Sequence, residues 1–176
     1  MALETATLGG GRFWDLEAVF QQIRGVKSTQ CGYAGGLNEC PTYETVCGGE
    51  TGHAEVLRLT FDNDILSYRH VLEVFFKIHN PLNAAIIDGR LASPHRSVIF
   101  FHSLEQKNQA LDTVKTMGLF SNAKVLTEVK PCPSFYPAEV EHQNFYKNHA
   151  NDTYSKEFIV PKILMSREVF KKRLAA

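Results

Sequence analysis

Three consecutive glycines, Gly9 to Gly11, stand between a short β-prone run and a segment whose apolar residues recur at helical spacing. The β-prone run covers Thr5 to Leu8, and the helical spacing extends from Phe13 to Ile23. The pattern predicts a strand, a glycine turn and a helix. Such a turn leaves free backbone N–H groups and the positive end of the helix dipole at residues 12 and 13, which favours an anion or an acidified thiol there.

Strand-like and helix-like segments alternate through the rest of the chain. Strands are predicted at 26–33, 53–61, 96–102 and 125–129, and helices at 66–78, 104–117, 138–149 and 161–170. The strand at 53–61 alternates apolar and polar residues, with Leu57 as the exception. Polar, turn-rich loops are predicted at 37–51 and 131–137. Interleaved strands and helices predict an α+β fold, a two-layer sandwich with a mixed β-sheet.

Length and composition limit the class of protein. With 176 residues, 44% of them hydrophobic, the chain predicts one domain over 1–176. Nineteen basic residues balance nineteen acidic ones, which argues against a nucleic-acid partner. No apolar run is long enough to span a bilayer, and residues 1–24 lack a signal-peptide pattern. We therefore expect no membrane contact, a cytoplasmic location and reduced cysteines.

Five separated motifs carry a family resemblance. They are Gly-Gly-Gly-Arg12-Phe13-Trp14, Gly32-Tyr33-Ala34-Gly35-Gly36, Thr51-Gly52-His53-Ala54-Glu55, His95-Arg96-Ser97, and Phe135-Tyr136-Pro137-Ala138-Glu139 with His142-Gln143. In this order they resemble peptide methionine sulfoxide reductase A over almost the whole chain. The resemblance implies that family's fold, with a ferredoxin-like core, and peptide-methionine (S)-S-oxide reductase chemistry. In that chemistry a cysteine in Gly-Cys-Phe-Trp attacks the sulfoxide sulfur, later cysteines resolve the product, and thioredoxin restores the thiol.

The resemblance assigns roles to four residues that match the family motifs. Phe13 and Trp14 correspond to the pocket for the substrate methyl group. Tyr33 corresponds to a tyrosine that positions the sulfoxide oxygen, and Glu55 corresponds to the proton donor.

The position of the attacking cysteine holds Arg12, whose guanidinium cannot attack sulfur. We therefore expect no ordinary reductase activity and no recycling by thioredoxin. A cation at a helix N-terminus opposes the dipole, so Arg12 needs an acidic partner or a side chain that points into solvent. Asp15, Glu55 and Glu141 are candidate partners.

Further departures from the family motifs fall at positions expected to line the same pocket. Arg90 takes the place of an acid, His95 that of a second tyrosine, and Val140 that of an aspartate. No cysteine follows Cys132 to act as a C-terminal resolving thiol. Two explanations fit, a natural relative that lost its chemistry or a scaffold whose pocket was rebuilt, and the joint placement of large polar residues favours an engineered pocket.

A rebuilt pocket suggests a hydrolase that acts on activated esters. His95 is the candidate base, and Cys40 is the first choice of nucleophile, followed by Cys31, because both flank the 32–37 loop. Free N–H groups at the start of the first helix would then form the oxyanion hole. Cys47 and Cys132 are interpreted as structural residues.

A third interpretation is a non-catalytic binder of a small ligand or anion. Arg12 and Arg90 would hold a carboxylate or phosphate, and Glu141 would add a polar contact. No cofactor is expected. A metal site is not expected either, because Cys31, Cys40, Cys47 and His53 lack regular ligand spacing. The sequence leaves open whether the protein is an enzyme.

Overall fold

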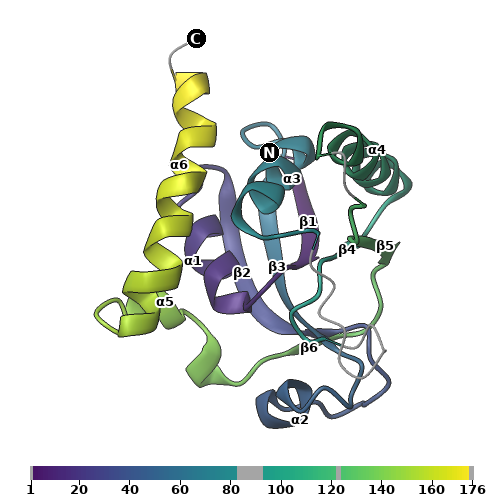
Figure 1. Ribbon diagram of the computed structural model, residues 1–176, viewed down its shortest axis with the longest axis vertical. Helices are drawn as coiled ribbons and strands as arrows, with labels where there is room; N and C mark the ends of the chain where they lie inside the picture. The colour runs from purple at the N-terminus through teal and green to yellow at the C-terminus, as the bar shows by residue number, and fades with distance from the viewer. Residues whose placement is uncertain (1, 83–92, 122–123, 175–176) are drawn as a thin grey trace.

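A six-stranded mixed sheet forms the centre of the fold (Figure 1), and the computed structural model describes residues 2–82, 93–121 and 124–174. The strands are β1 (Leu3–Gly9), β2 (Val26–Ala34), β3 (Ala54–Asp62), β4 (Val98–Phe101), β5 (Glu128–Pro131) and β6 (Phe135–Pro137). Their order is β5-β4-β1-β3-β2-β6, and only β4 and β5 run parallel within it. This arrangement confirms the predicted α+β fold with a mixed sheet.

Helices cover one face of the sheet. They are α1 (Phe13–Phe20), α3 (Tyr68–Ile78), α4 (Leu104–Ser121) and α6 (Val160–Leu174), with the short α2 (Tyr43–Cys47) and α5 (Phe145–Asn148) at the periphery. Figure 1 shows α6, α3 and α4 side by side in front of the strands. Buried side chains of α1, α3 and α6 form one large core with the sheet residues that point toward them. The core therefore lies between the two layers.

The two faces of β3 decide where Glu55 points. Leu57, Leu59 and Phe61 belong to the large core beneath the helices, whereas Ala54 and Val56 pack on the opposite face. Leu57 therefore follows the alternation, since it shares a face with Leu59 and Phe61. Ala54 and Val56 are the apolar residues that lie on the other face. Successive strand residues alternate between faces, so Glu55 shares the helix side with Leu57.

Several predicted element bounds are wrong. The 37–51 loop contains α2, whose N-terminus Thr42 closes with a capping box to Thr45, so Cys47 lies in a helix. The 131–137 loop contains β6, and the strand predicted at 125–129 is β5, at Glu128–Pro131.

Two helices near the C-terminus also differ from the prediction. The helix predicted at 138–149 is divided into a 3₁₀ turn, Val140–His142, and α5, because Asn144 adopts a left-handed backbone with φ of 55°. The last helix starts before Pro161, since the π-helix Ser155–Ile159 continues directly into α6. Pro161 therefore lies inside a continuous helical run and not, as predicted, at its first position.

A glutamine side chain extends the pairing of β2 beyond the end of β6. Gln143 Oε1 accepts the Cys31 backbone N–H at 2.9 Å, and its Nε2 donates to the Cys31 carbonyl at 2.9 Å. The same Nε2 donates to the Ala138 carbonyl at 3.0 Å. The Cys31 carbonyl also accepts the Ala138 backbone N–H at 2.9 Å, so the amide supplies the partner of the Cys31 N–H and shares the Cys31 carbonyl with the backbone.

Gln143→Ala should lower the free energy of unfolding by about 1–3 kcal/mol, because it leaves the Cys31 backbone N–H without its partner. Urea unfolding followed by circular dichroism measures the loss. Gln109→Ala is the matched control, since the Gln109 side chain makes only an exposed contact with Glu105. Equal stability of the two variants would contradict the role of Gln143.

His79 joins the end of α3 to the segment before β4. Its Nδ1 donates to the Phe75 carbonyl at 2.6 Å, and its Nε2 accepts from the Ser97 hydroxyl at 2.7 Å. Burial lowers the pKa of His79 to about 4. The folded protein therefore holds the neutral ring at pH values at which the unfolded chain already binds a proton.

Stability should consequently fall as the pH drops from about 6.5 to about 4, by about 3 kcal/mol for this group alone. His79→Gln should remove that component. The free energy of unfolding in urea, measured at pH 7 and at pH 4.5 for both proteins, tests the prediction. An identical decrease in the two proteins would show that His79 does not titrate in this window.

Candidate functional site

A buried carboxylate caps the first helix. Arg12 occupies the N-cap position of α1 without a side-chain capping bond, and Glu55 Oε2 accepts the Phe13 N–H at 3.0 Å instead. Glu55 is only 1% exposed. The positive end of the α1 dipole stabilises a negative charge at this point. The anion predicted at residues 12 and 13 is therefore supplied by the protein itself.

The glycine turn allows this approach. A Cβ on Gly10 would lie 2.7 Å from the His79 ring, and Gly11 has a φ of +77°. The Gly11 N–H donates to the His95 carbonyl at 3.1 Å, and the Glu55 N–H donates to the Pro94 carbonyl at 2.8 Å. The 93–97 segment is thus held between the glycine turn and β3.

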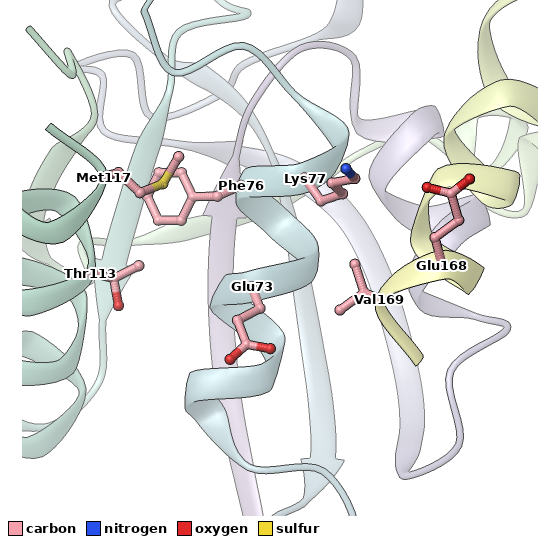
Figure 2. Close-up of a pocket in the computed structure, with 7 residues that line it drawn as sticks. All are labelled: Glu73, Phe76, Lys77, Thr113, Met117, Glu168 and Val169. Carbon is pink, nitrogen blue, oxygen red and sulfur yellow. The ribbon is translucent and has the colours of Figure 1, made fainter. Parts of the chain in front are cut away.

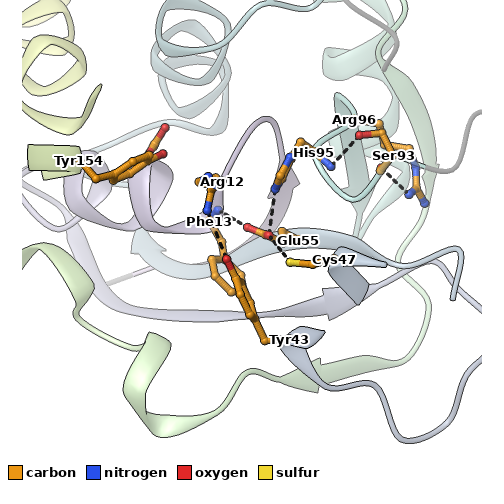
Figure 3. Close-up of polar contacts among 10 residues, drawn as sticks. Arg12, Phe13, Tyr43, Cys47, Glu55, Ser93, His95, Arg96 and Tyr154 are labelled. Atoms are coloured by element: carbon orange, nitrogen blue, oxygen red, sulfur yellow. Dashed lines mark hydrogen bonds and ion pairs between the residues drawn. The ribbon is translucent and has the colours of Figure 1, made fainter. Parts of the chain in front are cut away.

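His95 and Cys47 contact the second oxygen of Glu55 (Figure 3). His95 Nε2 lies 3.0 Å from Glu55 Oε1, and Cys47 Sγ lies 3.9 Å from the same oxygen. Together with the Phe13 N–H, three groups surround this carboxylate. His95 therefore lies beside Glu55 as the resemblance implies, but it pairs with a carboxylate and not with a thiol.

The Arg12 side chain lies among aromatic rings. Its Nη1 donates to the Tyr43 hydroxyl at 3.2 Å, and its Cζ lies 5.3 Å from the Trp14 ring centre and 5.2 Å from that of Tyr154. Figure 3 shows Arg12 between Tyr154 and the Glu55 cluster. The cation is thus held by ring faces and one hydroxyl.

The candidate acidic partners of Arg12 are engaged elsewhere or exposed. Asp15 accepts from the Tyr154 hydroxyl at 2.8 Å and pairs with Lys162. Glu55 caps α1, and Glu141 is exposed on the 3₁₀ turn. Within the described ranges, no carboxylate forms an ion pair with Arg12.

Tyr33 points to a different carboxylate. Its hydroxyl donates to Glu139 Oε2 at 2.7 Å, and Glu139 Oε1 accepts the Tyr43 N–H at 2.7 Å. Burial and the neighbouring Glu139 raise the pKa of Tyr33. Although burial opposes ionisation of Glu139, these two hydrogen bonds lower its pKa. Phe13 is fully buried, with its ring centre 5.8 Å from that of Tyr33, so it supports the site from below.

The structure does not pair either predicted nucleophile with His95. Cys40 is exposed, and Cys31 is buried with its Sγ directed to the Phe13 carbonyl at 3.7 Å. Burial and the nearby Glu17 raise the pKa of Cys31 well above its ordinary value. Cys47, interpreted as structural from the sequence, is the cysteine beside Glu55. Two features of the sequence could have indicated a helix here. Thr42 and Thr45 have the spacing of a capping box, and Tyr43 and Cys47 are four residues apart, which places their side chains on the same face of a helix.

The remaining predicted site residues do not join the cluster. Arg90 lies outside the described residues. Val140 is 85% exposed, so its replacement of the family aspartate does not line the pocket as expected. Among the residues described, no group of three or more histidines, cysteines and acids is placed to hold a metal ion. None of the helices in the described ranges is both long and apolar enough to cross a membrane.

Comparison with known sequences decides the family. The family described as "Peptide methionine sulfoxide reductase" matches residues 4–174. The chain is also 47% identical over 161 residues to a protein named peptide methionine sulfoxide reductase MsrA from Sulfolobus acidocaldarius, with 92% of each chain aligned. This chain belongs to the peptide methionine sulfoxide reductase family.

Solved structures agree with the family assignment. The reduced form of Mxr1 from Saccharomyces cerevisiae matches with a TM-score of 0.77 and 26% identity, covering 85% of this chain and 87% of Mxr1. Mxr1 in complex with Trx2 matches with a TM-score of 0.58 and 23% identity, covering 81% and 84% of the two chains. At that identity the second match concerns the fold alone.

Iodoacetamide at pH 8 should modify Cys40 and Cys47 in the native protein and leave Cys31 unmodified, because the Cys31 thiol is buried and its pKa is raised. Peptide mapping by mass spectrometry distinguishes the sites. Labelling in denaturant, where Cys31 must react, is the control. Native labelling of Cys31 at the rate of Cys40 would refute the buried assignment.

Proposed function

We propose that this family member does not reduce methionine sulfoxide and instead binds a small polar ligand at Arg12 without converting it. The observation that carries the proposal is the guanidinium at the N-terminus of α1, at the position that holds the attacking cysteine in the family motif. A guanidinium offers five N–H donors and no nucleophile. Chemistry that begins with sulfur attack is therefore missing its first step.

The other thiols do not supply a replacement. Cys31 is buried, Cys40 is exposed, and neither contacts Glu55 or His95 in the described structure. Cys47 contacts Glu55, but burial raises the pKa of its thiol, and it lies at the end of α2, away from the dipole that acidifies a thiol in position 12. Without a thiol that becomes oxidised, thioredoxin has no disulfide to reduce, so we propose no recycling step.

Proton donation is the second step that this site does not favour. The resemblance makes Glu55 the donor to the sulfoxide oxygen, but both of its oxygens already contact protein groups. One of the groups that contact Glu55 is His95, which stands where the family motif has a tyrosine. The pocket therefore departs from the family at the nucleophile and at the partner of its acid.

The geometry favours binding over ester hydrolysis. A Cys-His hydrolase needs its thiol within hydrogen-bond reach of the imidazole, and His95 Nε2 is occupied by Glu55. The argument for a rebuilt pocket also weakens, because Val140 and Glu141 are exposed. We therefore propose a relative that lost its chemistry, not a newly built catalyst.

Arg12 determines what kind of ligand fits. One of its donors binds the Tyr43 hydroxyl, while the other donors have no carboxylate partner among the described residues. A ligand with an acceptor oxygen, such as a sulfoxide or a carboxylate, would complete them. Trp14, the single tryptophan of the chain, lies against the guanidinium and would report binding by its fluorescence.

The test restores the missing groups one at a time. With methionine sulfoxide and dithiothreitol, the wild-type protein should form no methionine above background, and Arg12→Cys should form it measurably. Adding His95→Tyr to Arg12→Cys should increase the rate by about ten-fold or more, because Glu55 is then released to act as an acid. Methionine is quantified by chromatography.

Controls separate a gain at position 12 from a general effect of added thiols. Arg12→Ser should stay inactive, and Arg12→Cys with Cys40→Ser should keep the restored rate. Wild-type turnover equal to that of Arg12→Cys would overturn the proposal that the native site is not a reductase.

A further inference from the structure

A second cavity lies beside the Arg12 site, on the other side of the glycine turn. Its volume is about 450 Å³. The end of α3, the middle of α6, the glycine turn and His95 form its walls, with the lining residues Gly11, Lys77, Ile78, His79, Asn80, His95, Lys162 and Met165. Gly11 and His95 belong to the family motifs as well, whereas Lys77, Lys162 and Met165 belong neither to those motifs nor to the Arg12 site.

The polar part of the lining is basic. Lys77 and Lys162 contribute ammonium groups, and the described lining contains no carboxylate. Lys162 gives one donor to Asp15, which lies beside the cavity, and an ammonium carries three donors in all. Both ring nitrogens of His79 are used within the protein, so His79 gives the wall its shape without offering a donor.

The apolar part of the lining lies beside the lysines. Ile78 is buried in the core, whereas Met165 is 38% exposed and one helical turn from Lys162, so an alkyl chain would find a flexible thioether there. Basic donors beside an exposed thioether match a ligand that has an anionic head and a short hydrocarbon tail. Charge-assisted bonds from lysine would hold the head, and burial of methylene groups would hold the tail.

A groove on the far side of α3 provides a contrast (Figure 2). Lys77 reaches it too, but Glu73 and Glu168 line it as well. Two carboxylates would repel an anion there. Lys77 therefore lies at the boundary of the two spaces, and Lys162 is the cation that belongs to the basic cavity alone.

We propose that the cavity between α3, α6 and the glycine turn binds a short aliphatic carboxylate. Lys162, with Lys77 at the rim, binds the carboxylate, and the alkyl chain packs on Met165. This binding does not depend on Arg12, so the experiment below tests it independently of the proposed function.

Butyrate is the probe, and butyramide is its neutral counterpart of the same shape. Titration followed by two-dimensional NMR should move the signals of Gly11, Asn80 and Met165 with butyrate, and butyramide should bind at least about ten-fold more weakly. Lys162→Met should weaken butyrate binding by about ten-fold or more. Because this change also removes the Asp15 pair, Lys77→Ala provides a second variant, with an expected loss of about two-fold to five-fold.

Two controls locate the site. Lys115→Ala removes an exposed lysine of α4 that is not part of the cavity, and it should leave butyrate affinity unchanged. Arg12→Ala removes the donors of the neighbouring site, and it should leave the butyrate-induced shifts of Asn80 and Met165 unchanged. The proposal is overturned if butyrate does not shift these two signals, if butyramide shifts them equally well, if both lysine variants keep the wild-type response, or if Arg12→Ala abolishes the shifts.

Discussion

The bond from the Phe13 N–H to the buried Glu55 carboxylate organises the rest of the site. It joins the first turn of α1 to the start of β3, two elements that are 42 residues apart in sequence. Burying a carboxylate is costly unless donors surround it, and this one receives a backbone N–H at the positive end of a helix. His95 and Cys47 are then drawn to the other oxygen, so the composition of the pocket follows from the needs of one acid.

Arg12 at the N-terminus of α1 is compatible with folding because its guanidinium has other partners. The flat cation lies against the faces of Trp14 and Tyr154, whose electron-rich surfaces replace the counter-ion. Asp15 stays available for Lys162 and Tyr154, and it ties α6 to α1. The framework around Arg12 thus keeps the family's architecture.

Much of the fold could be predicted from the sequence, because the determining signals are local. The glycine turn, the face of α1 and the strand of Glu55 depend on spacing within a few residues. The hydrogen bonds of Gln143 with Cys31 and of Tyr33 with Glu139 join residues more than 100 positions apart, and local periodicity carries no information about such contacts. The prediction of a loop around Cys47 was wrong for a related reason, since α2 has only five residues and its capping box is a weak sequence signal.

Site chemistry was harder to predict than architecture. Motif order placed Glu55 and His95 near one another, but it did not indicate that they would pair with each other while Cys31 and Cys40 contact neither. Which group pairs with which acid depends on side-chain direction, and Val140 shows the same limit because a motif position proved to be exposed.

The amide of Gln143 has a consequence for how this protein behaves in a crowded solution. An open strand edge offers unpaired N–H and C=O groups on which a strand from another molecule can add. Next to Gly32, where the pairing of β2 with β6 ends, Gln143 binds the Cys31 N–H and shares the Cys31 carbonyl with the Ala138 N–H. One side chain thereby shortens the length of edge on which aggregation can begin.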